Sequence, residues 1–337
     1  MSTYRLCIPD GYRSELDVLE TEKAIKLLKD EFEDHLAKTL ALTRVSAPLF
    51  VHPESGLNDN LSGVERAVSF DILGDGSMAE VVHSLAKWKR LALQRYGVTV
   101  GHGLYTDMNA IRRDEVTDNL HSLYVDQWDW EKVIRREERT VETLQTIVKQ
   151  IYGVFRSVEA IACGQYDCLQ PKLPETITFI TTQELEDAYP DLTPSEREKE
   201  AAKKYGAIFL MQIGGVLRSG ERHDGRAPDY DDWQLNGDII FYYPLLDRAF
   251  EVSSMGIRVD EESLKKQLEL SGCTDRAELP FQKALLNGEL PLTVGGGIGQ
   301  SRLCMFFLNK AHIGEVQASL WPQEMLDECA EAGIPLL

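Results

Sequence analysis

The sequence predicts an α+β fold in which an antiparallel sheet is flanked by helices. Two observations carry this prediction. In the segment that runs through "VSFDILGDG" to "AEVVHS", apolar residues alternate with polar ones on both sides of a turn, as in paired strands. Apolar residues at helical spacing lie between groups of such strands rather than between single strands. Strands grouped in this way favour hairpin pairing over a βαβ arrangement.

The first helix is expected from Thr21 to Leu40, where Ile25, Leu28, Phe32 and Leu36 recur at helical spacing. The stretch "TRVSAPLF" follows, and its Pro48 predicts an extended or edge segment because proline cannot donate to a ladder. Alternation then predicts a strand through Val68, Phe70 and Ile72, the tight turn "GDG", and the antiparallel return "AEVVHS".

A second well-marked helix is expected in "TPSEREKEAAKKYG". Thr193 is its N-cap, Pro194 its first residue, Glu196 completes a capping box and Gly206 ends it. The apolar run "AIFLMQIGG" predicts a buried strand, and the polar residues from Arg218 to Gln234 predict a long loop.

The last third of the chain is expected to begin with two strands around a short connection, in "LNGDIIFYYPLLDRAFEVSSMGIRV". Two helical stretches follow, "DEESLKKQLELSG" and "RAELPFQKALLNG", and a last helix runs through Leu308. Neither a repeat nor a linker divides the 337 residues, so a single domain, 1–337, is expected.

The formal charge of −19 disfavours a nucleic-acid-binding protein, because such proteins neutralise phosphates with lysine and arginine. The six cysteines include no CxxC pair, which is typical of reduced thiols. The polar N-terminal residues do not resemble a signal peptide, and no apolar run is long enough to cross a membrane. A cytoplasmic protein without a membrane or nucleic-acid partner is expected.

The stretch "TVGGGIGQSRL" places four glycines between Gly295 and Gly299, ahead of Arg302. It satisfies neither the Rossmann nor the Walker A pattern. Glycines let a flat ligand approach the backbone, and an arginine can stack on a base or pair with a phosphate. The alternative is a plain turn before a helix, with an arginine on the surface.

In "EVSSMGIRV", Glu251 and Ser254 are oxygen ligands of the kind that Mg²⁺ prefers, and Asp238 on the preceding strand offers a second carboxylate. Arg258 suits a carboxylate substrate. The alternative is a strand with an ordinary polar face.

Two further stretches leave alternatives open. "HSLAKWKR" contains Lys87, Lys89 and Arg90, which either meet an anionic ligand or form a solvated helix face. In "HSLYVDQWDWEK", alternation places Gln127 and Asp129 on one side of a strand, which either lines a cleft or is a solvated edge.

Taken in order, several stretches resemble the ammonia-dependent asparagine synthetase A family, also called aspartate–ammonia ligase. They are "NDNLSG", "HSLAKWKR", "VDQWDWE", "RAPDYDDW", "LNGDI", "SSMGIRV" and "GGGIGQSRL", and they span nearly the whole chain. That family is similar to the catalytic core of class II aminoacyl-tRNA synthetases, especially the aspartyl type. The resemblance implies a class II synthetase-like sheet and a homodimer whose interface includes the first helix and the segment around Pro48.

The resemblance also implies a set of site residues. Arg112 would contact the α-phosphate of ATP and Arg302 the nucleotide end, above glycines that include Gly297. Mg²⁺ would be held by Asp238, Glu251 and Ser254. The aspartate carboxylates would be read by Lys89 and Arg258, and the aspartate and ammonia site would be lined by Asp59, Gln127 and Asp231, with Ser84 as a further candidate. Because "RRDE" places two residues between Arg112 and Glu115 where the synthetase motif has one, Glu115 is left aside.

The implied reaction forms β-aspartyl-AMP and pyrophosphate from aspartate and ATP, and ammonia then displaces AMP to give asparagine. Asp59 would hold ammonium and help to remove its proton. Two alternatives are an aspartyl-tRNA synthetase-like enzyme and a non-catalytic nucleotide-sensing paralogue. The negative charge and the absence of room for an anticodon-binding domain disfavour the first, and the arginines and acidic residues disfavour the second.

Overall fold

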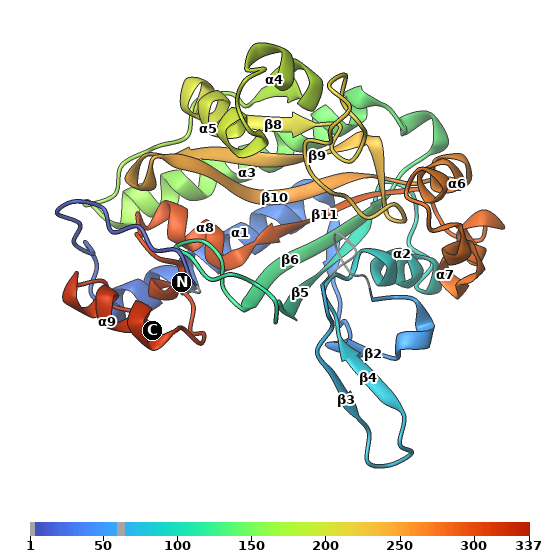
Figure 1. Ribbon diagram of the computed structural model, residues 1–337, viewed down its shortest axis with the longest axis horizontal. Helices are drawn as coiled ribbons and strands as arrows, with labels where there is room; N and C mark the ends of the chain where they lie inside the picture. Colours follow the sequence, from blue (N-terminus) through green and yellow to red (C-terminus); the bar gives the residue numbers. More distant parts are fainter. Residues whose placement is uncertain (1–3, 59–64) are drawn as a thin grey trace.

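The computed structural model describes residues 4–58 and 65–337 and contains an eight-stranded sheet (Figure 1). The strands lie in the order β1-β5-β6-β11-β10-β9-β8-β7. Their bounds are β1 Leu42–Arg44, β5 Gly103–Ile111, β6 Tyr124–Val133, β7 Thr178–Thr181, β8 Ala207–Met211, β9 Asp231–Tyr243, β10 Arg248–Arg258 and β11 Thr293–Gly299. The expected antiparallel sheet is confirmed for its central strands, whereas β1 pairs with β5, and β7 with β8, in parallel.

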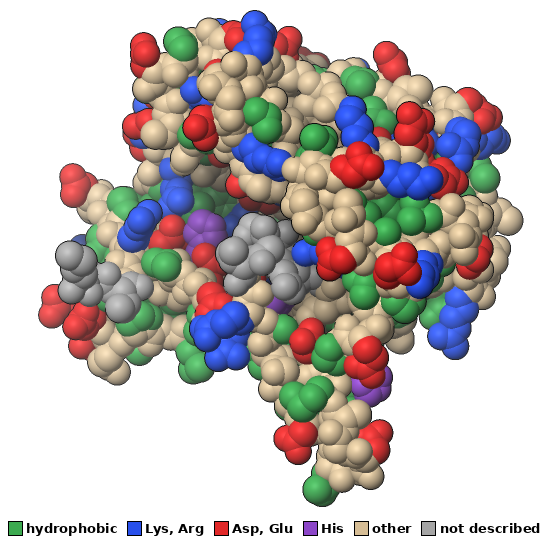
Figure 2. All heavy atoms as spheres, turned by 45° about the vertical axis from the view of Figure 1, so that its right-hand side comes forward, with side chains coloured by type: hydrophobic (Ala, Val, Ile, Leu, Met, Phe, Trp, Pro, Cys, Tyr) green, Lys and Arg blue, Asp and Glu red, His purple; other side chains and the backbone are tan. Residues whose placement is uncertain are grey.

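A separate three-stranded sheet has the order β2-β4-β3. It consists of β2 (Phe50–Val51), β3 (Ser69–Asp71) and β4 (Met78–Val81). The hairpin of β3 and β4 confirms the predicted strand, turn and return. Figure 2 shows this sheet projecting from the body with hydrophobic side chains on its surface, and Phe70, Leu73 and Met78 are exposed there.

One face of the large sheet is apolar and is covered by three helices, α1 (Val18–Leu40), α3 (Val141–Gln165) and α8 (Gln300–Phe307) (Figure 1). Phe32 of α1 stacks on Trp128 of β6, with ring centroids 4.8 Å apart. The helical spacing predicted for the first helix is confirmed, because Ile25, Leu28, Phe32 and Leu36 are all buried. The longest helix, α3, was not among the expected elements.

On the opposite face, the helices of the described residues pack near its two ends. At one end, α4 (Thr182–Ala188) and α5 (Pro194–Tyr205) pack on β8 and β9 through a small apolar cluster. The capping box of Thr193 and Glu196 is confirmed, and Gly206 ends α5 with a φ of 76°. At the other end, α2 (Ala86–Arg95) packs on β5 and β6. Within the described part of the chain, no helix covers the middle of this face, where a cavity lies instead.

The remaining helices lie at the periphery: α6 (Glu261–Leu270), α7 (Pro280–Leu286) and α9 (Gln323–Glu331). The first two confirm the predicted helical stretches. The expectation that the last helix ends at Leu308 is wrong, because α9 follows it. The predicted loop Arg218–Gln234 is too long, because its last four residues already pair as part of β9. Among the described residues, no helix is both long enough and apolar enough to cross a bilayer.

Candidate active site

The middle of the large sheet presents polar side chains from β6, β10 and β9, and the glycines of β11 lie between β6 and β10. Alternation in β6 turns Gln127, Asp129 and Glu131 to this face, while Trp128 and Trp130 enter the apolar core on the other. The alternative of a solvated edge is wrong, because β6 is paired on both sides, with β5 and with β11. The sequence pattern therefore identified a strand that lines a cleft.

The glycine-rich stretch is strand β11, paired with β6 and β10, and is neither a loop nor a turn. A Cβ on Gly295 would lie 2.0 Å from Oε2 of Glu131, and one on Gly297 would lie 2.6 Å from Oε1 of Gln127. Both residues have to be glycine because long side chains from β6 lie across β11. Because these glycines have no Cβ atoms, side chains of β6 can lie across β11, and the backbone of β11 itself is exposed to the cleft.

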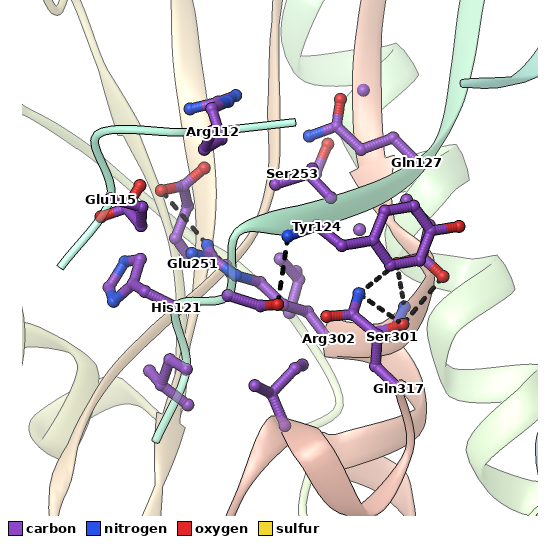
Figure 3. A pocket seen from close by; sticks show the side chains of 18 residues that line it. Arg112, Glu115, His121, Tyr124, Gln127, Glu251, Ser253, Ser301, Arg302 and Gln317 are labelled. Carbon is purple, nitrogen blue, oxygen red and sulfur yellow. Dashed lines mark hydrogen bonds and ion pairs between the residues drawn. The ribbon is translucent and has the colours of Figure 1, made fainter. Parts of the chain in front are cut away.

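Two adjoining cavities lie on this face. Cavity 1, about 250 Å³, is lined by Arg112, Gln127, Glu251, Gly297 and Arg302 together with residues of the 115–126 segment and of α8 (Figure 3). Cavity 2, about 320 Å³, shares the first four of these residues and is lined further by Ser84, Lys89, Asp231, Ser254 and Arg258. The structure therefore gathers most of the predicted site residues around one cleft.

A β-bulge brings the predicted metal ligands together. Glu251 and Ser254 are three residues apart, so a regular strand would turn them to opposite faces. Glu251 pairs with Ile240 and Ser253 with Ile239, which leaves Val252 as an extra residue. The two oxygen-bearing side chains consequently share a face, and Ser254 lies directly opposite Asp238 on β9.

Asp238 lines neither cavity directly and is ion-paired with Arg226, which lines cavity 2. Burial and the nearby Glu251 carboxylate raise the pKa of Asp238, against the opposing effect of Arg226. Burial also disfavours the charged form of Glu251, but Arg302 and Arg226 more than offset this and hold the pKa of Glu251 below its ordinary value. A divalent cation would relieve the repulsion between these two carboxylates.

Arg258 lines cavity 2 and is ion-paired with two buried carboxylates. Its Nε lies 3.0 Å from Oε1 of Glu131, its Nη2 lies 2.8 Å from Oε2, and its Nη1 contacts Asp231. Burial raises the pKa of Asp231. Burial also opposes the ionisation of Glu131, but Arg258 and Lys89 hold the pKa of Glu131 below its ordinary value.

The basic residues of "HSLAKWKR" are buried, so the alternative of a solvated helix face is wrong. Lys87, Lys89 and Arg90 are 3%, 1% and 2% exposed. Lys89 Nζ donates to the carbonyls of Trp130 and Gly296, each at 3.1 Å, and lies 3.3 Å from Oδ1 of Asp129. Arg90 instead donates to the carbonyls of Pro291 and Val259 and so serves the fold.

Two arginines flank cavity 1. Nη1 of Arg302 donates to the Glu251 carbonyl at 2.8 Å and lies 3.6 Å from Oε2 of the Glu251 carboxylate. Arg112 follows β5 and lines both cavities, and its buried Nε has no hydrogen-bond partner among the described residues. An unpaired buried donor of a cation beside a cavity is suited to an anionic ligand.

The structure adds residues that were not among the predicted site residues. Glu115, which was left aside, lines cavity 1 together with His121 (Figure 3). Glu131 continues the alternation of Gln127 and Asp129, so a strand pattern carried one step further would have found it. Arg226 is the first residue of the motif "RAPDYDDW" but was not among the predicted site residues. The predicted residue Asp59 lies outside the described residues.

Comparison with known proteins agrees with this geometry. A family model described as aspartate–ammonia ligase matches residues 19–333. An aspartate–ammonia ligase of Ruminiclostridium cellulolyticum is 66% identical over 330 residues, 98% of either chain. One of Fusobacterium nucleatum is 64% identical over 327 residues, 97% of this chain and 100% of the relative.

Solved structures show the fold. The asparaginyl-tRNA synthetase of Pyrococcus horikoshii, complexed with asparaginyl-adenylate, superposes with a TM-score of 0.64 at 13% identity, over 90% of this chain and 70% of the synthetase. The aspartyl-tRNA synthetase of Entamoeba histolytica superposes with a TM-score of 0.60 at 13% identity, over 88% of this chain and 57% of the synthetase. The expected class II synthetase-like fold is thereby confirmed.

Proposed function

Because the chain belongs to the aspartate–ammonia ligase family, we propose that its cleft makes asparagine from aspartate, ATP and ammonia. The observation that carries the proposal is the pair of adjoining cavities that share Arg112, Gln127, Glu251 and Gly297. A nucleotide in cavity 1 and an amino acid in cavity 2 would meet at this shared boundary. The whole chain, 1–337, acts as one catalytic unit in this proposal.

In the first step, an oxygen of the β-carboxylate attacks the α-phosphorus of ATP, and the bond to pyrophosphate breaks. The product is β-aspartyl-AMP. Arg112 contacts the α-phosphate, and its unpaired Nε supports this role. Arg302 covers the nucleotide over Gly297. Preorganised cations of this kind stabilise the charge that develops around phosphorus.

The residues Asp238, Glu251 and Ser254 fit a magnesium ion. The site offers two carboxylates and a hydroxyl on one face, and Mg²⁺ takes few protein ligands and keeps the rest for phosphate and water. Among the described residues, no cluster of three or more His, Cys, Asp or Glu side chains suits a metal that needs an all-protein cage. When bound, Mg²⁺ would neutralise phosphate charge and orient the leaving pyrophosphate.

At the amino-acid end, Lys89 and Arg258 bind the carboxylates of aspartate, and Ser84, Gln127 and Asp231 line the rest of the site. Lys89 and Arg258 are each ion-paired with a buried carboxylate of the cleft, Asp129 and Glu131, which holds the two cations in place. In the second step, ammonia attacks the acyl carbon and AMP leaves with its electron pair. Asp59 holds the ammonium ion and accepts its proton in this proposal.

The proposal includes a homodimer whose interface involves α1 and the segment around Pro48. Leu19 of α1 is 72% exposed, and Leu49 and Phe50 are about half exposed, at 51% and 47%. An interface with a second copy at these two segments would bury these apolar side chains. Sedimentation of the purified protein measures its mass directly, and a monomer at micromolar concentration would contradict this part.

The test of the reaction is an assay with aspartate, ATP and ammonium that follows AMP, pyrophosphate and asparagine, with and without tRNA. Asparagine formed without tRNA supports the ligase. AMP formed only when tRNA is present would instead support a synthetase, and binding of ATP without turnover would support a nucleotide sensor. Asp59→Asn is the test of proton removal: full rate at low ammonium would exclude that role.

A further inference from the structure

Cavity 1 has a polar end that the reaction scheme does not use. Gln317 follows the 3-10 turn Ile313–Glu315, is 5% exposed and lines cavity 1 but not cavity 2. Figure 3 shows it on the opposite side of the cavity from Arg112. If the phosphates lie at the shared boundary with cavity 2, the base of the nucleotide points toward Gln317.

The orientation of the Gln317 amide is fixed by its neighbours. Its Nε2 donates to Oδ1 of Asp126 at 3.3 Å and to Oγ of Ser301 at 3.1 Å. The Ser301 hydroxyl itself donates to Oδ2 of Asp126 at 2.8 Å, so it can only accept from Gln317. A reversed amide would turn its oxygen toward a carboxylate, and this repulsion excludes the flip.

Asp126 is itself held in place. It accepts from the backbone N–H of Ser301 at 3.0 Å and from Nζ of Lys29, also at 3.0 Å. The backbone bond caps the first turn of α8, whose N-cap is Gly299 and has no side chain of its own. The acceptor that orients Gln317 is therefore part of the helix cap and does not depend on a ligand.

This arrangement leaves the other side of the amide without a partner. Oε1 of Gln317 is buried and has no hydrogen-bond partner among the described residues. Buried acceptors of this kind are costly unless a ligand or water donates to them. The 6-amino group is the N–H donor that adenine offers at its edge, whereas guanine and hypoxanthine present an oxygen at that position.

We infer that Oε1 of Gln317 accepts a hydrogen bond from the 6-amino group of adenine and thereby selects adenine over 6-oxopurine nucleotides. The inference deepens the proposed function, on which it rests for the nucleotide in cavity 1. Asp126 and Ser301 are positioning residues, because they act through Gln317 and do not touch the base.

The test is a chemical double-mutant cycle measured by titration calorimetry on the intact protein, with no catalysis involved. AMP is compared with purine riboside 5′-monophosphate, which lacks the 6-amino group, and with inosine 5′-monophosphate. The wild type is expected to bind AMP about tenfold more tightly than either analogue. Gln317→Met keeps the volume and removes the acceptor, so it should bind AMP and the purine riboside within about a factor of two of each other.

Gln323→Met is the matched control, because Gln323 is exposed on α9 and lines neither cavity. It should keep the wild-type preference. If Gln317→Met weakens both ligands equally, Gln317 is only structural and the inference fails. If the effect of Gln317→Met depends instead on the ribose hydroxyls, as tested with 2′-deoxy-AMP and 3′-deoxy-AMP, then Oε1 accepts from the ribose. That result would overturn the assignment to the base.

Two further outcomes keep the test decisive. If Gln317→Met does not fold, equal affinity of the wild type for AMP and purine riboside monophosphate overturns the inference, and a tenfold gap supports it. Failure of the wild type to form asparagine while the coupling persists would remove the proposed reaction but leave base reading intact. If the wild type forms asparagine but shows no coupling, the proposed reaction stands and the inference about Gln317 fails.

Discussion

The carboxylate of Glu131 lies directly behind the guanidinium of Arg258 and accepts from both its Nε and its Nη2, at 3.0 Å and 2.8 Å. Glu131 is 0% exposed and also accepts from the hydroxyl of Thr293 at 2.6 Å. The pair joins β6 to the end of β10 across β11, which lies between them. The position of the proposed aspartate-binding arginine thus depends on a residue behind it.

Glu131→Gln should reduce the free energy of unfolding by roughly 3–5 kcal/mol, because it removes one of the buried carboxylates that are paired with Arg258 and Lys89. The KM for aspartate should rise more than kcat falls, since Arg258 would be misplaced for binding. Urea unfolding and steady-state kinetics measure the two effects. Glu262→Gln, an exposed change on α6, is the control. Unchanged KM in a folded Glu131→Gln protein would separate Glu131 from substrate binding.

Gly295→Ala should be destabilising by at least about 1–3 kcal/mol, because its Cβ would lie 2.0 Å from Oε2 of Glu131. Gly153→Ala should instead increase the stability of the protein. Gly153 is exposed within α3 with nothing within 4 Å of a new Cβ, so alanine should stabilise the helix by about 0.5–1 kcal/mol. Thermal unfolding of both variants tests the comparison, and a neutral Gly295→Ala would show that Glu131 can move aside at little cost.

Removal of one carboxylate of the proposed metal site should raise the Mg²⁺ requirement. Glu251→Gln is expected to increase the Mg²⁺ concentration for half-maximal AMP formation at least about tenfold, and Ser254→Ala should have a smaller effect because water replaces a hydroxyl ligand. The measurement is a Mg²⁺ titration at saturating ATP and aspartate. Exposed Glu269→Gln should match the wild type. A Glu251→Gln enzyme with the wild-type Mg²⁺ curve would rule out this ligand set.

Stability should fall in mild acid because of His312. Burial lowers the pKa of His312 to about 4, against about 6.5 in an unfolded chain. The unfolded chain therefore binds an extra proton between these values, so stability is lost as the pH falls from 6.5 toward 4. His312→Asn keeps an acceptor for the N–H of Gly314, which bonds Nδ1 at 3.0 Å. The unfolding free energy of His312→Asn should depend less on pH in this range than that of the wild type. Equal dependence on pH in the two proteins would refute the assignment to His312.

Thr193→Ala tests the cap that the sequence predicted. It should cost about 1 kcal/mol, because the Thr193 hydroxyl that donates to Oε2 of Glu196 at the start of α5 is lost. Ser195→Ala, an exposed change in the same turn, should be close to neutral. Urea unfolding of the pair measures the difference, and equal stabilities would mean that the cap is compensated elsewhere.

Local patterns located the elements whose signals are local. Caps and helical spacing marked α1 and α5, alternation marked β3, β4 and β6, and the ordered motifs identified the family and most of the residues now found around the two cavities. These features depend on residues within one turn or one strand of each other. For the same reason the sequence alone could not distinguish a buried lysine from a solvated one.

Tertiary structure decided what depends on distant partners. Lys89 is buried because its ammonium reaches carbonyls of β6 and β11, the latter more than 200 residues away in the chain. The glycine-rich stretch is a strand, β11, because it pairs with β6 and β10. Its residues are glycines because Glu131 and Gln127 occupy the space above them. The bulge at Val252 placed Glu251 and Ser254 on one face. The sequence by itself determined which chemical groups are present and the family to which the chain belongs, whereas packing between strands determined which of these groups are buried and able to meet.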